Sequence, residues 1–256
     1  MLFETDKLNQ DAIARLADGQ AMAIRVKNYL PREQALKVAD KILSPGYAHY
    51  LNAPSIGRIG MAFYEAENRP DMLDAYFEQA AINIDDLRQR CAPYASPIDR
   101  LRCELDEAWP AGAHLEKLYG KKMFIGLSRV VEPDVYFLAH HDILAKDAPD
   151  SYQARSLEAQ FACNLYLDMP EDGGELEIWQ RELPPDEFDA MRGDSYGIDP
   201  ALLGEPSLRI KPESGELVIF NSRKMHAVAP SKHSSRLSLS CFIGYRGAHS
   251  PLTFWS

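Results

Sequence analysis

The sequence predicts an α+β fold in which N-terminal helices pack on a double-stranded β-helix, or jelly-roll, core. The spacing of apolar residues is helical in the first half and changes at Lys122 to short alternating runs separated by Gly, Pro and Asp turns. The 256 residues are 46% hydrophobic and 26% charged, enough to bury a sizeable core. We therefore expect one domain over 1–256, with 1–121 as mainly helical support and 122–248 as the jelly-roll core.

Amphipathic helices are predicted at four places in the first half. Apolar residues there recur three and four positions apart, and Pro31 suits a first helical turn. The aromatic stripe around Phe77 is typical of a helix packed on a sheet. Between the first two helices, Ala21–Val26 is expected to be a short strand at a sheet edge. The predicted helices are Asp6–Ala17, Pro31–Leu43, Pro70–Arg90 and Ile98–Trp109.

Strands are predicted at seven places after Lys122, and two sheets built from them would form the mouth of a jelly-roll barrel. One connection, Arg181–Pro206, is rich in Pro, Asp and Glu, and a loop of that length is typical of a lid or a disordered excursion. The predicted strands are Met123–Val131, Val135–His140, Ala159–Met169, Gly174–Trp179, Ser207–Ile210, Glu216–Phe220 and Arg236–Tyr245.

A metal site is indicated where the second of these strands ends, at His140-His141-Asp142. Side chains alternate along a strand, so His140 and Asp142 share one face and His141 points outward. They supply two ligands of a 2-His-1-carboxylate triad, which holds non-haem Fe(II) with open positions. His226 is the candidate third ligand, from a distant segment after another strand. A lone His-x-Asp is common by chance, so the ordered set carries the prediction.

An anion site is predicted ten residues beyond His226. Arg236 and Ser238 alternate with apolar residues and so share a face. The planar guanidinium binds a carboxylate through two parallel charge-assisted hydrogen bonds, and the neighbouring hydroxyl adds a third.

The order of these motifs resembles the Fe(II)/2-oxoglutarate-dependent oxygenases, which share the jelly-roll with the cupins. Pro170–Trp179 is similar to the Gly-Gly-Glu-Leu strand entry of that superfamily, including its prolyl-hydroxylase-like branch. Ile56–Phe77, the His-x-Asp region and the final Phe254-Trp255-Ser256 more closely resemble carrier-independent aliphatic halogenases and related small-molecule hydroxylases. The resemblance implies Fe(II), O₂ and 2-oxoglutarate, with the distal carboxylate of 2-oxoglutarate on Arg236 and Ser238.

Asp142 is where the sequence departs from those halogenases. They have Gly at this position, and the vacancy admits chloride to the iron. Because the carboxylate is present here, the expected outcome is hydroxylation.

Four further residues are weaker candidates. Asn164 and Tyr166 alternate on one strand and either could hydrogen-bond 2-oxoglutarate, although strand packing with a capped polar tip is the more common reason for such residues. Arg58, between two glycines, is a candidate clamp for a substrate carboxylate, against the alternative of a solvated turn. Arg129, in the strand before the His-x-Asp strand, is a candidate substrate-binding residue if it faces inward.

Composition excludes several partners. The net charge of −10, without a basic block, argues against nucleic acid binding. The four cysteines are scattered as expected for reduced thiols in a cytoplasmic protein. No signal peptide or apolar stretch long enough to span a membrane is recognisable. The oligomeric state cannot be inferred.

The function predicted from the sequence is hydroxylation of an unactivated C–H bond in a small molecule, a free amino acid or a natural-product intermediate, with release of succinate and CO₂. Two alternatives stay open: a prolyl-type hydroxylase of protein residues, and a metal-binding barrel without turnover. The intact triad and Arg236 argue against the second alternative.

Overall fold

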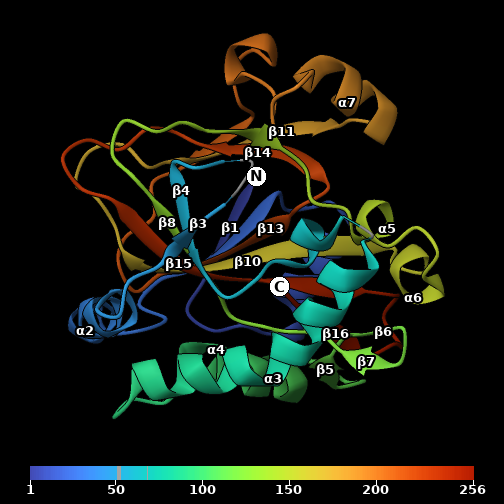
Figure 1. Ribbon diagram of the computed structural model, residues 1–256, viewed down its shortest axis with the longest axis horizontal. Helices are drawn as coiled ribbons and strands as arrows, with labels where there is room; N and C mark the ends of the chain where they lie inside the picture. Colours follow the sequence, from blue (N-terminus) through green and yellow to red (C-terminus); the bar gives the residue numbers. More distant parts are fainter. Residues whose placement is uncertain (51–52, 68) are drawn as a thin grey trace.

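Two β-sheets face each other in the structure, a computed structural model that describes residues 1–50, 53–67 and 69–256 (Figure 1). The larger sheet has ten strands among the described residues. Its order is β1 (Leu2–Thr5), β2 (Ala23–Val26), β13 (Leu217–Asn221), β10 (Ala159–Asp168), β15 (Arg236–Tyr245), β8 (Leu127–Val131), β4 (Ile56–Ile59) and β3 (Ala48–His49), with β16 (Leu252–Trp255) paired to β15 and to β5 (Ala113–Leu115).

The smaller sheet has the order β12 (Leu208–Ile210), β11 (Leu176–Glu182), β14 (Lys224–Val228) and β9 (Phe137–His140). From β8 to β15 the chain passes back and forth between the sheets, with β8, β10, β13 and β15 in the larger one and β9, β11, β12 and β14 in the smaller one. Only β11 and β12 follow each other within one sheet, where they pair. A separate two-stranded ribbon joins β6 (Lys117–Leu118) to β7 (Lys121–Lys122).

Helices cover the outer face of the larger sheet, and one short helix packs on the outer face of the smaller sheet. In Figure 1, α3 and α4 lie below β10 and β15, and α7 lies above, beside β11. None of the described helices is long and apolar enough to cross a membrane. The helices are α1 (Gln10–Ala17), α2 (Arg32–Leu43), α3 (Pro70–Cys91), α4 (Pro97–Ala108), α5 (Leu144–Asp147), α6 (Tyr152–Arg155) and α7 (Pro185–Arg192), with 3₁₀ turns η1 (Phe63–Ala66) and η2 (Pro200–Leu202).

Strand alternation divides the interior into two environments. In β15, Leu237 and Leu239 join the apolar core beneath the helices, whereas Arg236 and Ser238 line a cavity between the sheets. β10 does the same, because Cys163 belongs to the helix-side core and its neighbours face the other sheet. The same strands therefore build the hydrophobic core on one face and supply polar groups on the other.

Most predicted elements are found with shifted ends, and one placement is wrong. α1 begins only at Gln10, because the Asn9 side chain accepts a hydrogen bond from the amide of Ala12 and caps the helix there. The Ala21–Val26 strand is not at a sheet edge, since β2 pairs with β13 on one side and in parallel with β1 on the other. β14 was not predicted, and the 181–206 connection contains α7 and η2.

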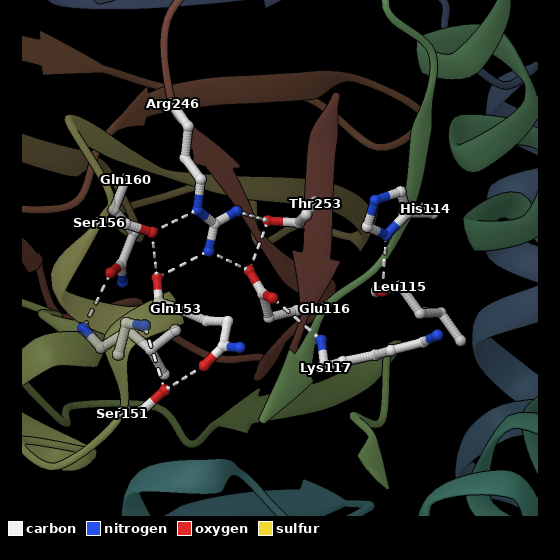
Figure 2. A network of polar contacts seen from close by, with 12 residues as sticks. His114, Leu115, Glu116, Lys117, Ser151, Gln153, Ser156, Gln160, Arg246 and Thr253 are labelled. Carbon is white, nitrogen blue, oxygen red and sulfur yellow. Dashed lines mark hydrogen bonds and ion pairs between the residues drawn. The ribbon is translucent and has the colours of Figure 1, made fainter. Parts of the chain in front are cut away.

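A polar network fixes the segment that follows the strand β9. Figure 2 shows the guanidinium of Arg246, just beyond β15, at its centre. It joins strand β16, the residue after β5 and helix α6 in one set of contacts. It donates to Oε2 of Glu116 (2.6 Å), Oγ1 of Thr253 (3.0 Å), Oγ of Ser156 (2.8 Å) and the carbonyl of Gln153 (2.7 Å).

Gly173, in the turn between β10 and β11, lies close to the backbone of Pro230, which follows β14. It has φ +74°, and a Cβ there would collide with the carbonyl oxygen of Pro230. Gly19 is the matched control, with φ +71° and nothing within 4 Å of its Cβ position. We expect Gly19→Ala to lower the free energy of unfolding by about 1–2 kcal/mol, the cost of a left-handed conformation. Gly173→Ala should lose about 1–3 kcal/mol more from overpacking, measured by urea denaturation. Equal losses in the two variants would contradict the close contact between Gly173 and Pro230.

Candidate metal centre

His140, Asp142 and His226 converge at the edge of the space between the sheets. Each offers one ligand atom, and these atoms lie within 4.8 Å of one another. β9 and β14 pair so that His140 lies directly opposite His226, with ring centroids 4.2 Å apart. The Oδ2 atom of Asp142 is 3.3 Å from Nε2 of His226 and 3.9 Å from Nε2 of His140. Two strands that are far apart in sequence thus bring the three predicted ligands together.

Backbone contacts fix the tautomer of both imidazoles. Nδ1 of His140 is 2.8 Å from the carbonyl of Leu138, and Nδ1 of His226 is 2.9 Å from the carbonyl of Lys224. A carbonyl only accepts, so each Nδ1 carries the proton and each Nε2 presents a lone pair. Burial, then the neighbouring His226 ring, lowers the pKa of His140 to about 3. This imidazole is therefore neutral near pH 7, as a metal ligand must be.

The donor set fits a divalent cation. Two bare Nε2 atoms face Oδ2 of Asp142, and this buried oxygen has no hydrogen-bond partner among the described residues. Three lone-pair atoms repel one another unless a cation or a proton lies among them. Two imidazoles and one carboxylate form the facial set that suits non-haem Fe(II) and leaves positions for other ligands.

The backbone around Asp142 is also fixed. The amide of Asp142 donates to the carbonyl of Ser222 (2.9 Å), and the amide of Ser222 donates to the carbonyl of Gln160 (3.0 Å). The side chain of Gln160, labelled in Figure 2, accepts from the amide of Leu144 (2.9 Å). The short segment after β9 is thereby attached to β10 and β13, which limits movement of the carboxylate relative to the histidines.

A narrow cavity between the sheets extends from His140 and His226 to Arg236 and Ser238. Arg236 is only 5% exposed, and its Nε and one Nη have no partner among the described residues. Its guanidinium lies 4.9 Å from the Tyr166 ring centroid. Burial lowers the pKa of Arg236, although the group stays cationic. An unpaired buried cation is costly, so this position suits an anion bound next to the metal site.

A second cavity, of about 230 Å³, opens on the other side of His140 and Asp142. Helices α5 and α7 contribute to its wall, together with residues from η1, β8 and the loop before β4. The residues that line it include Tyr50, Tyr64, Glu67, Arg129, Phe137, His141, Lys146, Asp147, Phe188, Arg192 and Tyr196. The three ligand atoms therefore lie at the junction of two cavities.

The other predicted site residues fall into two groups. Asn164 lines the narrow cavity, and Tyr166 is buried beside Arg236 with an unpaired hydroxyl. Arg129 lines both cavities. Arg58 is engaged elsewhere, because it forms an ion pair with Glu65 (2.7 Å) and donates to the carbonyl of Gly60 (2.6 Å). Arg58 is not among the described residues that line either cavity.

His141 and Asp147 are cavity residues that the sequence did not reveal. His141 was expected outside, but it is buried and packs against Phe188, with ring centroids 4.3 Å apart. Asp147 ends the one-turn helix α5, which was not predicted. Only the position of Asp147 five residues after a ligand pointed toward the site, and a single acidic residue at that spacing is not a specific signal.

Comparisons with known proteins agree with this geometry. A family model described as the 2OG-Fe(II) oxygenase superfamily matches residues 125–244, which include the three ligands and Arg236. The chain is 27% identical over 208 residues to the L-gamma-glutamyl-L-propargylglycine hydroxylase of Streptantibioticus cattleyicolor, covering 78% of this chain and 74% of that protein. It is 28% identical over 227 residues to leucinostatins biosynthesis cluster protein S of Purpureocillium lilacinum, covering 79% and 86% respectively.

The fold is also similar to a solved structure. An N-substituted L-amino acid dioxygenase of Burkholderia ambifaria in complex with alpha-KG (2-oxoglutarate) superposes with a TM-score of 0.64 at 18% identity, covering 96% of this chain and 90% of that one. Fold, ligand set and family model agree. Over residues 125–244 the chain thus matches the 2OG-Fe(II) oxygenase superfamily, and its ligand set agrees with a dioxygenase of the hydroxylase kind that depends on Fe(II), 2-oxoglutarate and O₂.

Proposed function

We propose that the enzyme hydroxylates an unactivated C–H bond of a small molecule, a free amino acid or a natural-product intermediate, and releases succinate and CO₂. The observation that carries the proposal is the position of the triad between two cavities. One cavity contains the unpaired Arg236, and the other has room, about 230 Å³, for a small substrate. The hydroxylase from S. cattleyicolor, whose name specifies an amino-acid derivative, supports the substrate class.

In this proposal each side chain has one role. His140, Asp142 and His226 hold Fe(II), and Arg236 with Ser238 binds the distal carboxylate of 2-oxoglutarate. When bound, Fe(II) and 2-oxoglutarate supply the oxidation, because decarboxylation of the cosubstrate drives activation of O₂. Asn164 and Tyr166 are candidates for further hydrogen bonds to the cosubstrate. Arg58 has the weakest support as a substrate residue, since Glu65 already pairs with it.

The strand arrangement supports a jelly-roll interpretation of residues 122–248. Successive strands from β8 to β15 cross between the sheets, except for the paired strands β11 and β12, as in a double-stranded β-helix. The pairing of β9 with β14 places ligands from both strands at one end of the smaller sheet. We propose that the first 121 residues support this core, with β1, β2, β3 and β4 extending the larger sheet.

The alternatives have less support. A hydroxylase of protein residues needs an extended groove, whereas α5 and α7 contribute Lys146, Phe188 and Arg192 to the wall of the cavity beside the triad. In a metal-binding barrel without turnover, an unpaired buried arginine beside the metal site would cost stability and bind no cosubstrate. We also propose a cytoplasmic location, because Cys91, Cys163 and Cys241 are buried free thiols.

The test combines cosubstrate turnover with product identity. The purified protein, Fe(II), 2-oxoglutarate and O₂ are incubated with candidate amino acids in buffer with excess chloride. We expect succinate release and a product heavier by one oxygen atom. Asp142 fills the coordination position that a halide would need, and its charge opposes chloride. A chlorinated main product would contradict this role of Asp142, and absence of succinate release would contradict the proposed function.

A further inference from the structure

We propose that the substrate is an amino acid with both charges free, its carboxylate bound by Arg129 and its ammonium bound by Asp147. Both residues line the 230 Å³ cavity beside His140 and Asp142. The inference rests on the proposed function and specifies the substrate class that this cavity admits.

Arg129 is a cavity cation that forms no ion pair with any acidic side chain among the described residues. It lies in β8, directly between Ser238 of β15 and Arg58 of β4. Its Nε is buried and makes no hydrogen bond to any residue that the structure describes. Burial opposes its charge, but Tyr50, Asp142 and Tyr64 outweigh that effect and leave the pKa of Arg129 above its ordinary value. Arg129 is thus a permanent charge that a carboxylate would neutralise.

The other two basic side chains in the cavity already share an acidic partner. Nζ of Lys146 is 3.1 Å from Oδ1 of Asp189, and Nε of Arg192 is 2.7 Å from the same oxygen. Both cations also lie near the ring of Phe188, at 4.9 and 5.9 Å from its centroid. A substrate carboxylate would have to compete with Asp189 for them, which leaves Arg129 as the favoured site.

Asp147 is the complementary anion. Its carboxylate lines the cavity but forms no hydrogen bond or ion pair within residues 1–50, 53–67 and 69–256. The adjacent Lys146 is committed to Asp189. Burial, and then the charge of Asp142, raise the pKa of Asp147 to about 7. A cationic partner would offset the cost of burial, so this carboxylate gains more from an ammonium than a solvated one does.

Glu67 is a less suitable partner for the ammonium, although it also lines the cavity. Its side chain is exposed to solvent, where a charge pair contributes little. With Arg236 assigned to the cosubstrate and Arg129 to the substrate, each carboxylate has its own guanidinium. The enzyme should then prefer a free amino acid to an N-acylated one, because the N-acylated form has no ammonium to pair with Asp147.

The test uses matched substrates and variants of the Fe(II)- and 2-oxoglutarate-loaded enzyme. The panel contains the free L-amino acids, their N-acetyl derivatives and their methyl esters, and binding is also measured by calorimetry without O₂. We expect the free amino acids to have kcat/KM values roughly 10- to 100-fold above either derivative, the range for losing one charged hydrogen bond. Asp147→Asn should remove the preference over the N-acetyl form, and Arg129→Gln should remove the preference over the ester.

Two controls make the result decisive. Asp150→Asn, at an exposed position close in sequence, should leave substrate selectivity unchanged. The Kd of 2-oxoglutarate should be unchanged in Asp147→Asn. The inference is overturned if Asp147→Asn weakens free and N-acetylated amino acids equally, or if succinate is released while no free amino acid is bound or hydroxylated. The proposed function fails by a different result, in which the wild-type enzyme releases no succinate from 2-oxoglutarate.

Discussion

His226→Ala is expected to abolish metal binding and, with it, succinate release. The variant leaves one imidazole and one carboxylate, so the facial set is incomplete. Loss of a group that merely orients a metal ligand costs about 10–100-fold in affinity, and loss of a ligand itself should exceed that. Calorimetric titration with Fe(II) under nitrogen measures the effect directly, before any turnover assay.

His141→Ala is the matched control for this variant. His141 lies between the two β9-end ligands in sequence, but its ring packs on Phe188. The His141→Ala variant should retain wild-type metal affinity. The comparison therefore distinguishes the loss of a metal ligand from the loss of a buried histidine that is not a ligand. A folded His226→Ala protein with wild-type Fe(II) affinity would show that the metal is held elsewhere.

Arg236→Lys is expected to weaken 2-oxoglutarate binding by about 1.5–3 kcal/mol, the value for a hydrogen bond to a charged group. This corresponds to roughly 10- to 100-fold in Kd. Lysine keeps the charge but loses the planar pair of donors and the packing against Tyr166. Calorimetry with metal-loaded protein gives the Kd, and Fe(II) affinity should not change.

Arg209→Lys controls for a general effect of removing an arginine. Arg209 is largely exposed on β12 and pairs with Glu177 outside both cavities. A 2-oxoglutarate Kd that is the same in Arg236→Lys as in Arg209→Lys would contradict the assignment of Arg236. Arg236→Met should bind 2-oxoglutarate more weakly than Arg236→Lys. Without the cosubstrate it should also unfold at a higher temperature than the wild-type protein, because the substitution removes an unpaired buried charge.

The elements best predicted from sequence are those whose pattern has a single interpretation. Arg236–Cys241 alternates without a break, and β15, which continues to Tyr245, has the predicted ends. β14 was missed because Lys224-Met225-His226 has no clear alternation and follows a strand after only two residues. Its position depends on pairing with β9 and β11, which a local pattern does not encode.

The site shows the same limit. The positions of His140, Asp142, His226 and Arg236 around one space were predictable because strand alternation and chain order restrict where they can point. The partners of Arg58 were not predictable, since Glu65 reaches it through the turn at η1. Asp147 was also not predictable, because a one-turn helix places it in the cavity and so short a helix leaves no periodic signal.

The alternation of core-facing and cavity-facing side chains in β15 and β10 also limits which insertions and deletions the protein can tolerate. Inserting or deleting one residue within β15 would turn Leu237 and Leu239 into the cavity and place Arg236 and Ser238 under the helices. One such event would destroy the core and the anion site together. We therefore expect homologous chains to differ in these strands by substitution alone, and to gain or lose residues in connections such as 181–206.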